Sequence, residues 1–197
     1  MNKTPQSLFN EITQDNDVLR EFKNHSNRVM YLTTMLGKAI NCYDEELKVA
    51  ALLHDIGKMG LSKSILFKPE KLTPLEKRII ESHSHVGNLI VRKELNMPRA
   101  AQFVRDHHEN WDGSGYPRGL KGEDISIQGR MIRICDTFDT MTYEVRHYST
   151  YKMSHEEAFE ELRRCAWREF DGQLVETFIS LVKEHGTSND WSTAMKT

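Results

Sequence analysis

Apolar residues recur at helical spacing along most of the chain. Between positions 18 and 40 they follow one another after three, four or seven residues, which places them on one face of a helix. This face contains Val18, Phe22, Val29, Leu32, Leu36 and Ile40. A second apolar run, DEELKVAALLHD at 44–55, has the same character. We expect a helix over each segment.

Two later helices have clear start signals. Thr73, Pro74 and Glu76 form a capping box with proline at the first helical position, at the head of TPLEKRIIESHSHVGNLIVRKEL. Ser154 and Glu157 repeat the capping box at the head of SHEEAFEELRRCAW. The sequence therefore predicts a helix that begins at each of these points.

The rest of the pattern is helical as well. A helix is expected over PRAAQFVRDHHE, and it must end before the glycine-dense loop DGSGYPRGLKG at 112–122. Helical spacing resumes after the loop, and a last helix is expected near 173–185. No strand-like alternation longer than a few residues interrupts it. The predicted fold class is all-α, a single-domain helical bundle over 16–186, with a dispensable polar extension at 1–15 and a tail at 187–197.

Composition and charge narrow the functional classes. The chain has 197 residues and a formal net charge of -2, so it lacks the basic excess expected of a protein that binds a nucleic-acid polymer. Cys42, Cys135 and Cys165 are far apart and odd in number, which predicts reduced thiols and a cytoplasmic location. No apolar run is long enough to span a membrane, and the N-terminus has no signal-peptide pattern.

Nine histidines carry the strongest indication of chemistry, because histidine is the commonest metal ligand at neutral pH. His54 and Asp55 close one predicted helix, and His107 and His108 close another. Side chains from different helices can converge at such ends. His85, His147, His155 and His185 are expected at the surface.

Four further candidates lie within helices. His25 follows Glu21 by four residues and shares its helix face. His83 lies on an otherwise apolar face, which should point inward. Asp136 falls in a largely apolar helix, where a carboxylate needs a partner or a cation.

Each candidate also has an ordinary structural interpretation. A lone buried histidine is more often a hydrogen-bonded core residue. Asp55 could end a helix, Glu21 could be a solvated charge, and Asp136 could form a buried ion pair. Five histidines and three carboxylates together are costly to bury without a cation, so the set favours metal binding. Nitrogen and oxygen ligands suit iron or manganese, and two ions that share a carboxylate favour phosphoester hydrolysis.

Four motifs closely resemble the HD-GYP family. They are HDIGKMG at 54–60, ILFKPEKLT at 65–73, HSHVG at 83–87 and HHENWDGSGYPRGLKGEDI at 107–125. The resemblance implies a helical bundle of the HD-domain type in a cytoplasmic bacterial signalling protein, with two or three divalent metal ions, commonly iron or manganese. The implied reaction is hydrolysis of cyclic di-GMP to linear pGpG or GMP by a metal-bridging hydroxide.

The resemblance also implies metal ligands. One ion would be held by four residues: His25, His54, Asp55 and Asp136. Asp55 would bridge to a second ion, whose other ligands are His83, His107 and His108. Glu21 matches a position that supports a third ion in some members.

Three further residues match positions with a role towards the substrate. Lys58 would neutralise charge on the scissile phosphate, or is an exposed helix-end lysine. Tyr116 would contact a guanine base or the substrate backbone, or packs the loop that Gly115 and Pro117 shape. Asp139 matches a substrate-contacting or orienting position.

One segment departs from the family pattern. Where members usually have a segment like TSDRPYRKALS, this chain has TYEVRHYSTYKMS, with two extra residues. Arg146 and Tyr148 correspond to the arginine and tyrosine of that pattern, and Lys152 is the candidate for the second phosphate. An altered pocket leaves 3′3′-cyclic GMP-AMP as an alternative substrate.

Other functional classes also remain open. The chain could be a non-catalytic dinucleotide-binding module that signals through a partner such as a GGDEF-type diguanylate cyclase. An HD-domain oxygenase or a mononucleotide hydrolase is less favoured because of the GYP loop. The residues before Glu21 are too few for a sensor domain, and the apolar face of a terminal helix allows a homodimer.

Overall fold

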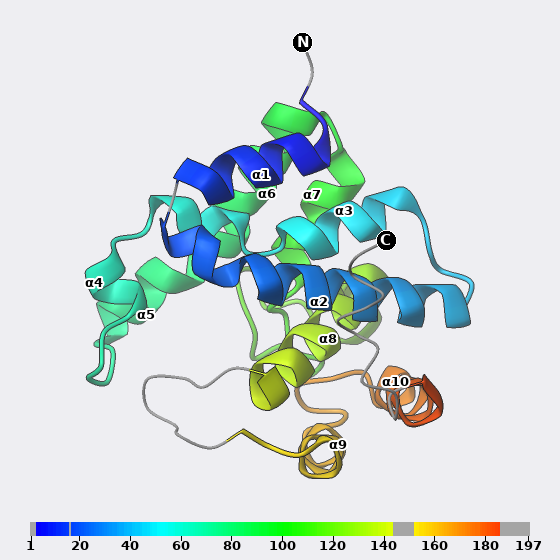
Figure 1. Ribbon diagram of the computed structural model, residues 1–197. Helices are drawn as coiled ribbons and strands as arrows, with labels where there is room; N and C mark the ends of the chain where they lie inside the picture. Colours follow the sequence, from blue (N-terminus) through cyan, green and yellow to red (C-terminus); the bar gives the residue numbers. More distant parts are fainter. Residues whose placement is uncertain (1–2, 16, 144–151, 186–197) are drawn as a thin grey trace.

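The computed structural model describes residues 3–15, 17–143 and 152–185. Its helices are α1 (Pro5–Asp15), α2 (Asp17–Ala39), α3 (Glu45–Leu53), η1 (Ile56–Gly60), α4 (Lys63–Leu66), α5 (Pro74–Glu81), α6 (His83–Leu95), α7 (Pro98–Asp106), η2 (Gly122–Asp124), α8 (Ile127–Tyr143), α9 (His155–Arg164) and α10 (Gly172–His185). No strand occurs among these residues, apart from an isolated bridge between Ala166 and Phe170. The all-α prediction is confirmed (Figure 1).

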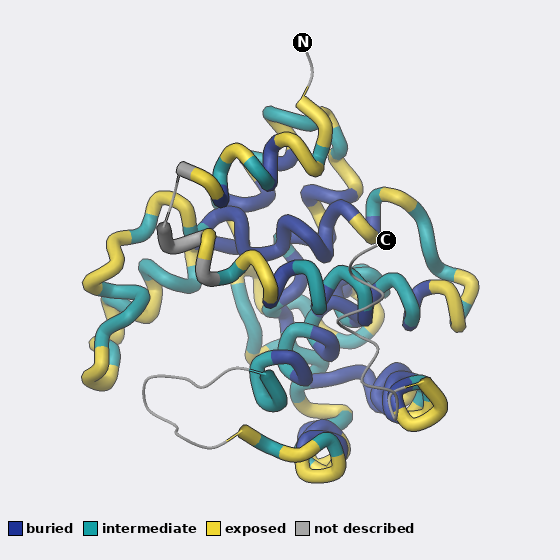
Figure 2. The backbone as a smooth tube through the Cα atoms, in the orientation of Figure 1, coloured by how far each residue is buried: buried dark blue, intermediate teal, exposed yellow. Residues whose placement is uncertain are grey.

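The core forms where the long helices cross. The helix α2 runs across the molecule and packs against α3 and α8, while α6 packs against α7 (Figure 1). The buried residues of α3 occupy most of that helix, which lies in the interior in Figure 2. The helices α9 and α10 cover the end of α8, where the rings of Phe159 and Phe178 lie 5.6 and 5.1 Å from that of Phe138.

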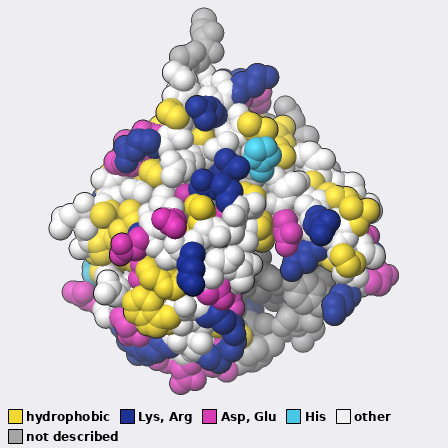
Figure 3. All heavy atoms as spheres, turned by 180° about the vertical axis from the view of Figure 1, so that it is seen from behind, with side chains coloured by type: hydrophobic (Ala, Val, Ile, Leu, Met, Phe, Trp, Pro, Cys, Tyr) yellow, Lys and Arg dark blue, Asp and Glu magenta, His cyan; other side chains and the backbone are white. Residues whose placement is uncertain are grey.

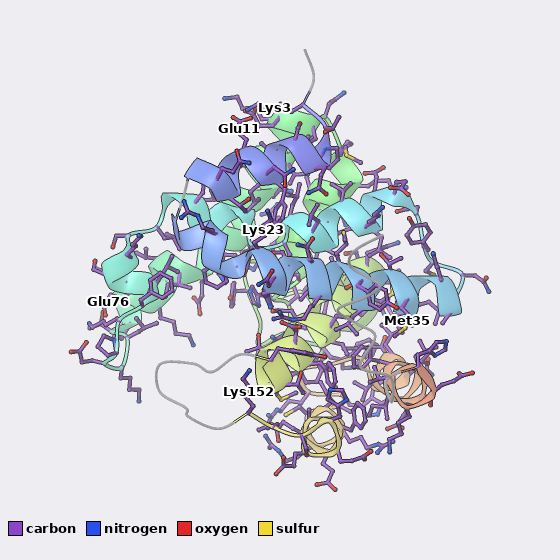
Figure 4. All side chains as sticks on the ribbon, in the orientation of Figure 1. Lys3, Glu11, Lys23, Met35, Glu76 and Lys152 are labelled. Atoms are coloured by element: carbon purple, nitrogen blue, oxygen red, sulfur yellow. The ribbon has the colours of Figure 1, made fainter. Side chains whose placement is uncertain are left out.

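Both predicted capping boxes are present. The Thr73 hydroxyl accepts the N–H of Glu76, whose carboxylate accepts the Thr73 N–H, and the Ser154 cap repeats the arrangement. Glu76 lies on the arm formed by α4 and α5 in Figure 4.

The segment from Thr73 to Leu95, for which the sequence predicted the start, forms two helices, α5 and α6, which meet at Ser82. Side chains at the junction hydrogen-bond to backbone carbonyls: Ser82 Oγ donates to the carbonyl of Ile79, and His83 Nδ1 lies 2.7 Å from that of Ile80. Such local bonds compete with the helical ladder, so a new helix begins at His83.

The N-terminal segment differs from the expectation of a dispensable polar extension. It forms α1, which packs on α2 and α3 and buries Leu8, Phe9 and Thr13. Leu8, Phe9 and Ile12 lie at helical spacing, but three apolar residues on one short helix are too weak a pattern to reveal this packing from the sequence. The predicted tail at 187–197 lies outside the described residues.

The surface and the cysteines agree with the compositional analysis. On the face seen in Figure 3, acidic and basic side chains are interspersed. Cys42, Cys135 and Cys165 form no disulfide. Within the part of the chain that the structure describes, no helix is both long and apolar enough to pass through a bilayer.

Candidate metal centre

Seven of the eight predicted ligands converge in the interior, in two groups. Most of them lie where a helix begins or ends: His54 and His107 are the C-caps of α3 and α7, and His83 is the first residue of α6. His25 and Asp136 project from within α2 and α8, the two helices that pack against each other. Helices far apart in sequence thus bring these side chains together.

The first group consists of His25, His54 and Asp136. The Nε2 atom of His25 lies 3.2 Å from Nε2 of His54 and 3.2 Å from Oδ1 of Asp136. The His54 Nε2 atom lies 3.9 Å from the same carboxylate oxygen. Two imidazole nitrogens and one carboxylate oxygen therefore face a common point.

The second group consists of Asp55, His83, His107 and His108. Nε2 of His83 lies 3.3 Å from Nε2 of His107 and 3.3 Å from Oδ1 of Asp55. The ring centres of His107 and His108 are 4.0 Å apart. In each of the two groups the candidate ligand atoms all lie within 4.8 Å of one another.

Asp55 lies between the two groups. Its Oδ1 atom faces His83, whereas its Oδ2 atom lies 3.6 Å from Nε2 of His54 and 4.0 Å from Nε2 of His25. Each carboxylate oxygen is thus directed to a different group. This is the placement that the predicted bridging role requires.

Hydrogen bonds fix which nitrogen of three histidines faces the groups. Nδ1 of His54, His83 and His107 lies 2.8, 2.7 and 2.6 Å from the backbone carbonyl three residues earlier. A carbonyl can only accept a hydrogen bond, so Nδ1 carries the proton. The same bonds satisfy carbonyls that lack a partner at a helix end. Each Nε2 lone pair is left free to bind a cation.

His25 lies in the middle of α2, where the carbonyls are engaged in the helix, and it has a different partner. Its Nδ1 atom lies 2.7 Å from Oδ2 of Asp139, a fully buried carboxylate on α8. Arg28 donates to both oxygens of Asp139, at 2.6 and 2.8 Å. Both Asp139 oxygens are therefore engaged within the protein, which favours the orienting role over direct contact with a substrate.

Burial and charge set the protonation of the centre. Burial lowers the pKa of His83 to about 4 and holds the pKa values of His107 and His108 well below their usual range. Burial also lowers the pKa of His25, but bonds to Asp136 and Asp139 outweigh it and raise that pKa to about 10.

The carboxylates of the centre are ionised. Burial disfavours the charged form of Asp55, but Lys58 and the neighbouring histidines hold its pKa well below the usual range. Burial likewise disfavours ionised Asp136, and its bond with His25 more than compensates and lowers its pKa. Neutral histidines and charged carboxylates are the forms that bind a metal, so His83, His107 and His108 are ready to bind, whereas His25 would release a proton when a metal ion binds.

The residues fit a metal ion. The lone pairs of His83 and His107 face each other at 3.3 Å without a proton between them, and a shared cation would turn this repulsion into attraction. The donor set contains nitrogen and oxygen and no thiolate, which suits iron or manganese better than a structural zinc site. The two groups can therefore hold metal ions.

Lys58 and Tyr116 lie at the edges of these groups. The Lys58 ammonium is 2.6 Å from Oδ2 of Asp55 and 4.6 Å from the centre of the Phe22 ring. The Tyr116 ring stacks on His108 with centres 4.8 Å apart, and the Tyr116 N–H donates to the carbonyl of His108. Burial raises the pKa of the Tyr116 hydroxyl, so it stays protonated and can donate a hydrogen bond.

The loop that carries Tyr116 is anchored by a residue that sequence reasoning missed. Glu109 is buried, and its carboxylate accepts the backbone N–H groups of Arg118 at 2.8 Å and Leu120 at 2.9 Å. Gly115 approaches the backbone of residues 108–110 so closely that a Cβ atom would lie 2.2 Å from the nitrogen of Asn110. The sequence signal for Glu109 was its position directly after His107 and His108.

Arg28 was also missed, although spacing could have indicated it. It follows His25 by three residues, as Asp139 follows Asp136, so each pair shares one face of its helix. Two facing helices, α2 and α8, then bring the four side chains together.

Four predicted site residues remain, and their side chains are either outside the described part of the structure or exposed. Glu21 belongs to α2, one turn before His25, and its side chain is not among those described. Arg146 and Tyr148 lie outside the described residues. Lys152 is exposed and lies near the end of α8 in Figure 4, where Met153 donates a backbone bond to Met141.

The structure is thus a helical bundle in which histidines and aspartates from several helices form a candidate metal centre. The HD domain family matches residues 8–174, and the chain belongs to this family. The solved structure of an HDG"Y"P protein from Bdellovibrio bacteriovorus has a similar fold, with a TM-score of 0.65 at 18% identity over 82% of this chain and 52% of that chain.

Curated relatives are similar at the sequence level. The chain is 36% identical over 182 residues to a cyclic di-GMP phosphodiesterase from Thermotoga maritima. The matched region covers 90% of this chain and 48% of the relative. It is 40% identical over 123 residues to the 3′3′-cGAMP-specific phosphodiesterase 3 of Vibrio cholerae. This matched region covers 61% of this chain and 27% of the relative. The expected relationship to the HD-GYP proteins is confirmed, and the chain spans about half the length of the Thermotoga relative.

Proposed function

We propose that the protein is a metal-dependent phosphodiesterase that hydrolyses cyclic di-GMP to linear pGpG or GMP. The observation that carries this proposal is Asp55, whose two oxygens face two separate histidine groups. A pair of ions that shares one carboxylate is a common arrangement for in-line displacement at phosphorus. The cyclic di-GMP phosphodiesterase name of the Thermotoga relative supports the same substrate.

In this proposal the candidate ligands keep the roles that the family resemblance implied. His25, His54, Asp55 and Asp136 would hold one ion, and Asp55 with the three other histidines would hold the second. Glu21 would contribute to a third, and iron or manganese is the metal that the donor set suits best. When bound, such ions act as Lewis acids and generate a nucleophile at neutral pH by lowering the pKa of water.

The remaining site residues would act on the substrate. Lys58 carries the positive charge closest to Asp55 and would offset negative charge that develops on the phosphate. Tyr116 would place its ring or its hydroxyl against the dinucleotide. Arg146 and Lys152 are proposed to bind the phosphates outside the reacting bond, and Asp139 acts through His25.

A second substrate follows from the relatives. The 40% identity to the Vibrio cholerae phosphodiesterase named for 3′3′-cGAMP makes that dinucleotide the alternative substrate.

The proposed location is the cytoplasm, which agrees with the three free cysteines. The proposed protein partners are a diguanylate cyclase and a second copy of the chain.

The test is direct. Purified protein is reconstituted anaerobically with ferrous iron or manganese and incubated with cyclic di-GMP or 3′3′-cGAMP, and the products are separated by chromatography. We expect linear dinucleotide or mononucleotide from at least one substrate, with none from His83→Ala. The control is His85→Ala, an exposed histidine two residues further along α6. Intact dinucleotide with both metals would refute the proposal, and binding without hydrolysis would favour the non-catalytic module.

A further inference from the structure

Half-buried Arg28 and fully buried Asp139 form an ion pair behind one of the candidate ligands. The guanidinium donates from Nε to Oδ1 at 2.6 Å and from Nη2 to Oδ2 at 2.8 Å, a bidentate arrangement. The same Oδ2 atom accepts the Nδ1 proton of His25 at 2.7 Å. Three side chains from α2 and α8 are thus joined in series.

Both members of the Arg28–Asp139 pair are held in place by their surroundings. Asp139 is fully buried, and the Arg28 guanidinium lies 4.7 Å from the centre of the Tyr143 ring, one turn further along α8. A buried carboxylate without a cationic partner would be strongly destabilising. Arg28 offsets this charge, and its planar fork also fixes the plane of the carboxylate.

This arrangement differs from that of three other candidate histidines. His54, His83 and His107 are oriented by backbone carbonyls of their own chain segments, at 2.6 to 2.8 Å. A carbonyl keeps its place as long as the helix persists. The His25 ring instead depends on a side chain that is itself oriented by another side chain.

We propose that Arg28 is a positioning residue for one of the two metal sites. Acting through Asp139, it fixes the ring orientation and the Nδ1–H tautomer of His25. It thereby sets the affinity of the site that contains His25, His54 and Asp136, while the site of His83, His107 and His108 is independent of it. This inference rests on the metal binding in the proposed function and does not depend on the substrate.

The test measures manganese binding to Arg28→Gln. Metal-free protein is titrated with Mn²⁺, and free Mn²⁺ is followed by electron paramagnetic resonance. We expect two or more bound ions in the wild-type protein, one of which binds about 10- to 100-fold more weakly in the variant, the usual effect when a group that orients a ligand is lost. The affinity of a second ion should stay within about twofold.

Arg130→Gln is the matched control. Arg130 is similarly buried and pairs with Asp171, away from the candidate ligands. Its loss should lower the midpoint of thermal unfolding at least as much as Arg28→Gln does, with unchanged Mn²⁺ affinities. A purely structural role for Arg28 would give both variants the same binding curve as the wild type.

Two further variants keep the inference testable. Arg28→Lys retains the charge without the fork, so its Mn²⁺ affinity should fall between those of the wild type and Arg28→Gln, and it replaces Arg28→Gln if that variant does not fold. The double variant Arg28→Gln/Asp139→Asn should bind no more weakly than Asp139→Asn alone, because the two residues act in series.

The outcomes separate the two proposals. Unchanged Mn²⁺ binding in the Arg28 variants, an equal loss at both sites, or a wild-type protein that binds only one ion would overturn the inference. A wild-type protein that binds two ions but hydrolyses neither dinucleotide would overturn the proposed function and leave this inference standing. Because the loss lies in metal affinity, saturating Mn²⁺ should restore the kcat of Arg28→Gln to that of the wild type.

Discussion

The ammonium of Lys58 lies 2.6 Å from Oδ2 of Asp55, the carboxylate between the two histidine groups. A cation bound by Asp55 would be repelled by this ammonium at short range. Lys58→Met should therefore bind Mn²⁺ as tightly as the wild type or more tightly, while kcat falls by about 100-fold or more because charge on the phosphate is no longer offset. Metal titration and steady-state kinetics measure the two effects separately.

Lys77→Met is the control for this change, since Lys77 is exposed on α5 and pairs only with Glu81 at 3.6 Å in the described structure. Both kcat and Mn²⁺ affinity should match the wild type. Weaker metal binding by Lys58→Met would mean that the lysine supports the metal centre instead of the phosphate.

Metal should stabilise the fold. The facing lone pairs of His83 and His107 repel in the metal-free protein, and an ion that binds only the folded state stabilises it by about 2.7 kcal/mol at a hundred times its dissociation constant. We expect the unfolding midpoint to rise with Mn²⁺ concentration and to fall on addition of a chelator. In His107→Ala the rise should be smaller than in His85→Ala, and equal rises in the two variants would contradict a metal site at His107.

The metal-free protein should be most stable near pH 6.5. The pKa of His83 falls from its ordinary 6.5 to about 4, so the unfolded chain takes up this proton first and stability is lost as the pH falls from 6.5 towards 4. The lowered pKa values of His107 and His108 act in the same direction. The pKa of His25 is raised to about 10, so its contribution is complete below pH 6.5 and is lost as the pH rises towards 10.

Urea unfolding at a series of pH values in the presence of a chelator checks this profile. Each proton that is bound by one state alone changes the stability by about 1.4 kcal/mol per pH unit. The acidic limb should be less steep in His83→Phe, which lacks one of the buried histidines, whereas His85→Ala should keep the wild-type slope. A flat profile between pH 4.5 and 6.5 would contradict burial of neutral histidines.

Glu109 should control the loop that carries Tyr116. Glu109→Ala leaves the N–H groups of Arg118 and Leu120 without their acceptor, so the loop is held less firmly. We expect faster amide hydrogen exchange at both residues and a higher KM, with little change in Mn²⁺ affinity. Glu123→Ala, an exposed change in η2, should leave exchange and KM unaltered.

The sequence pattern predicted those parts of the fold that depend on local rules. The caps at Thr73 and Ser154 form as expected, because a capping box is complete within four residues. The break at Ser82 was not predicted, since it depends on side chains that bond to carbonyls of the preceding turn. The burial of Leu8 was missed because it depends on α1 meeting α2 and α3.

The candidate site divides in the same way. Histidines and aspartates at helix ends and on inward faces indicated a shared centre, and the ring of His107 lies 5.2 Å from that of His54 and 5.3 Å from that of His83. Which atom of each ring faces the centre could not be predicted, because backbone carbonyls decide it. Spacing places Arg28 on the face of His25 and Asp139 on the face of Asp136, but the contact between Arg28 and Asp139 joins residues 111 positions apart and depends on how α2 and α8 pack.

The bonds from His54 and His107 to the carbonyls three residues earlier tie the geometry of the centre to helix length. One residue added within α3 or α7 would turn the histidine that follows by about 100° and move it by about 1.5 Å along the axis. The ring would then leave the centre even though the composition of the site is unchanged. Additions to the connection between α4 and α5, which carries no candidate ligand, should be tolerated, whereas additions to the helices that end at a candidate ligand should not.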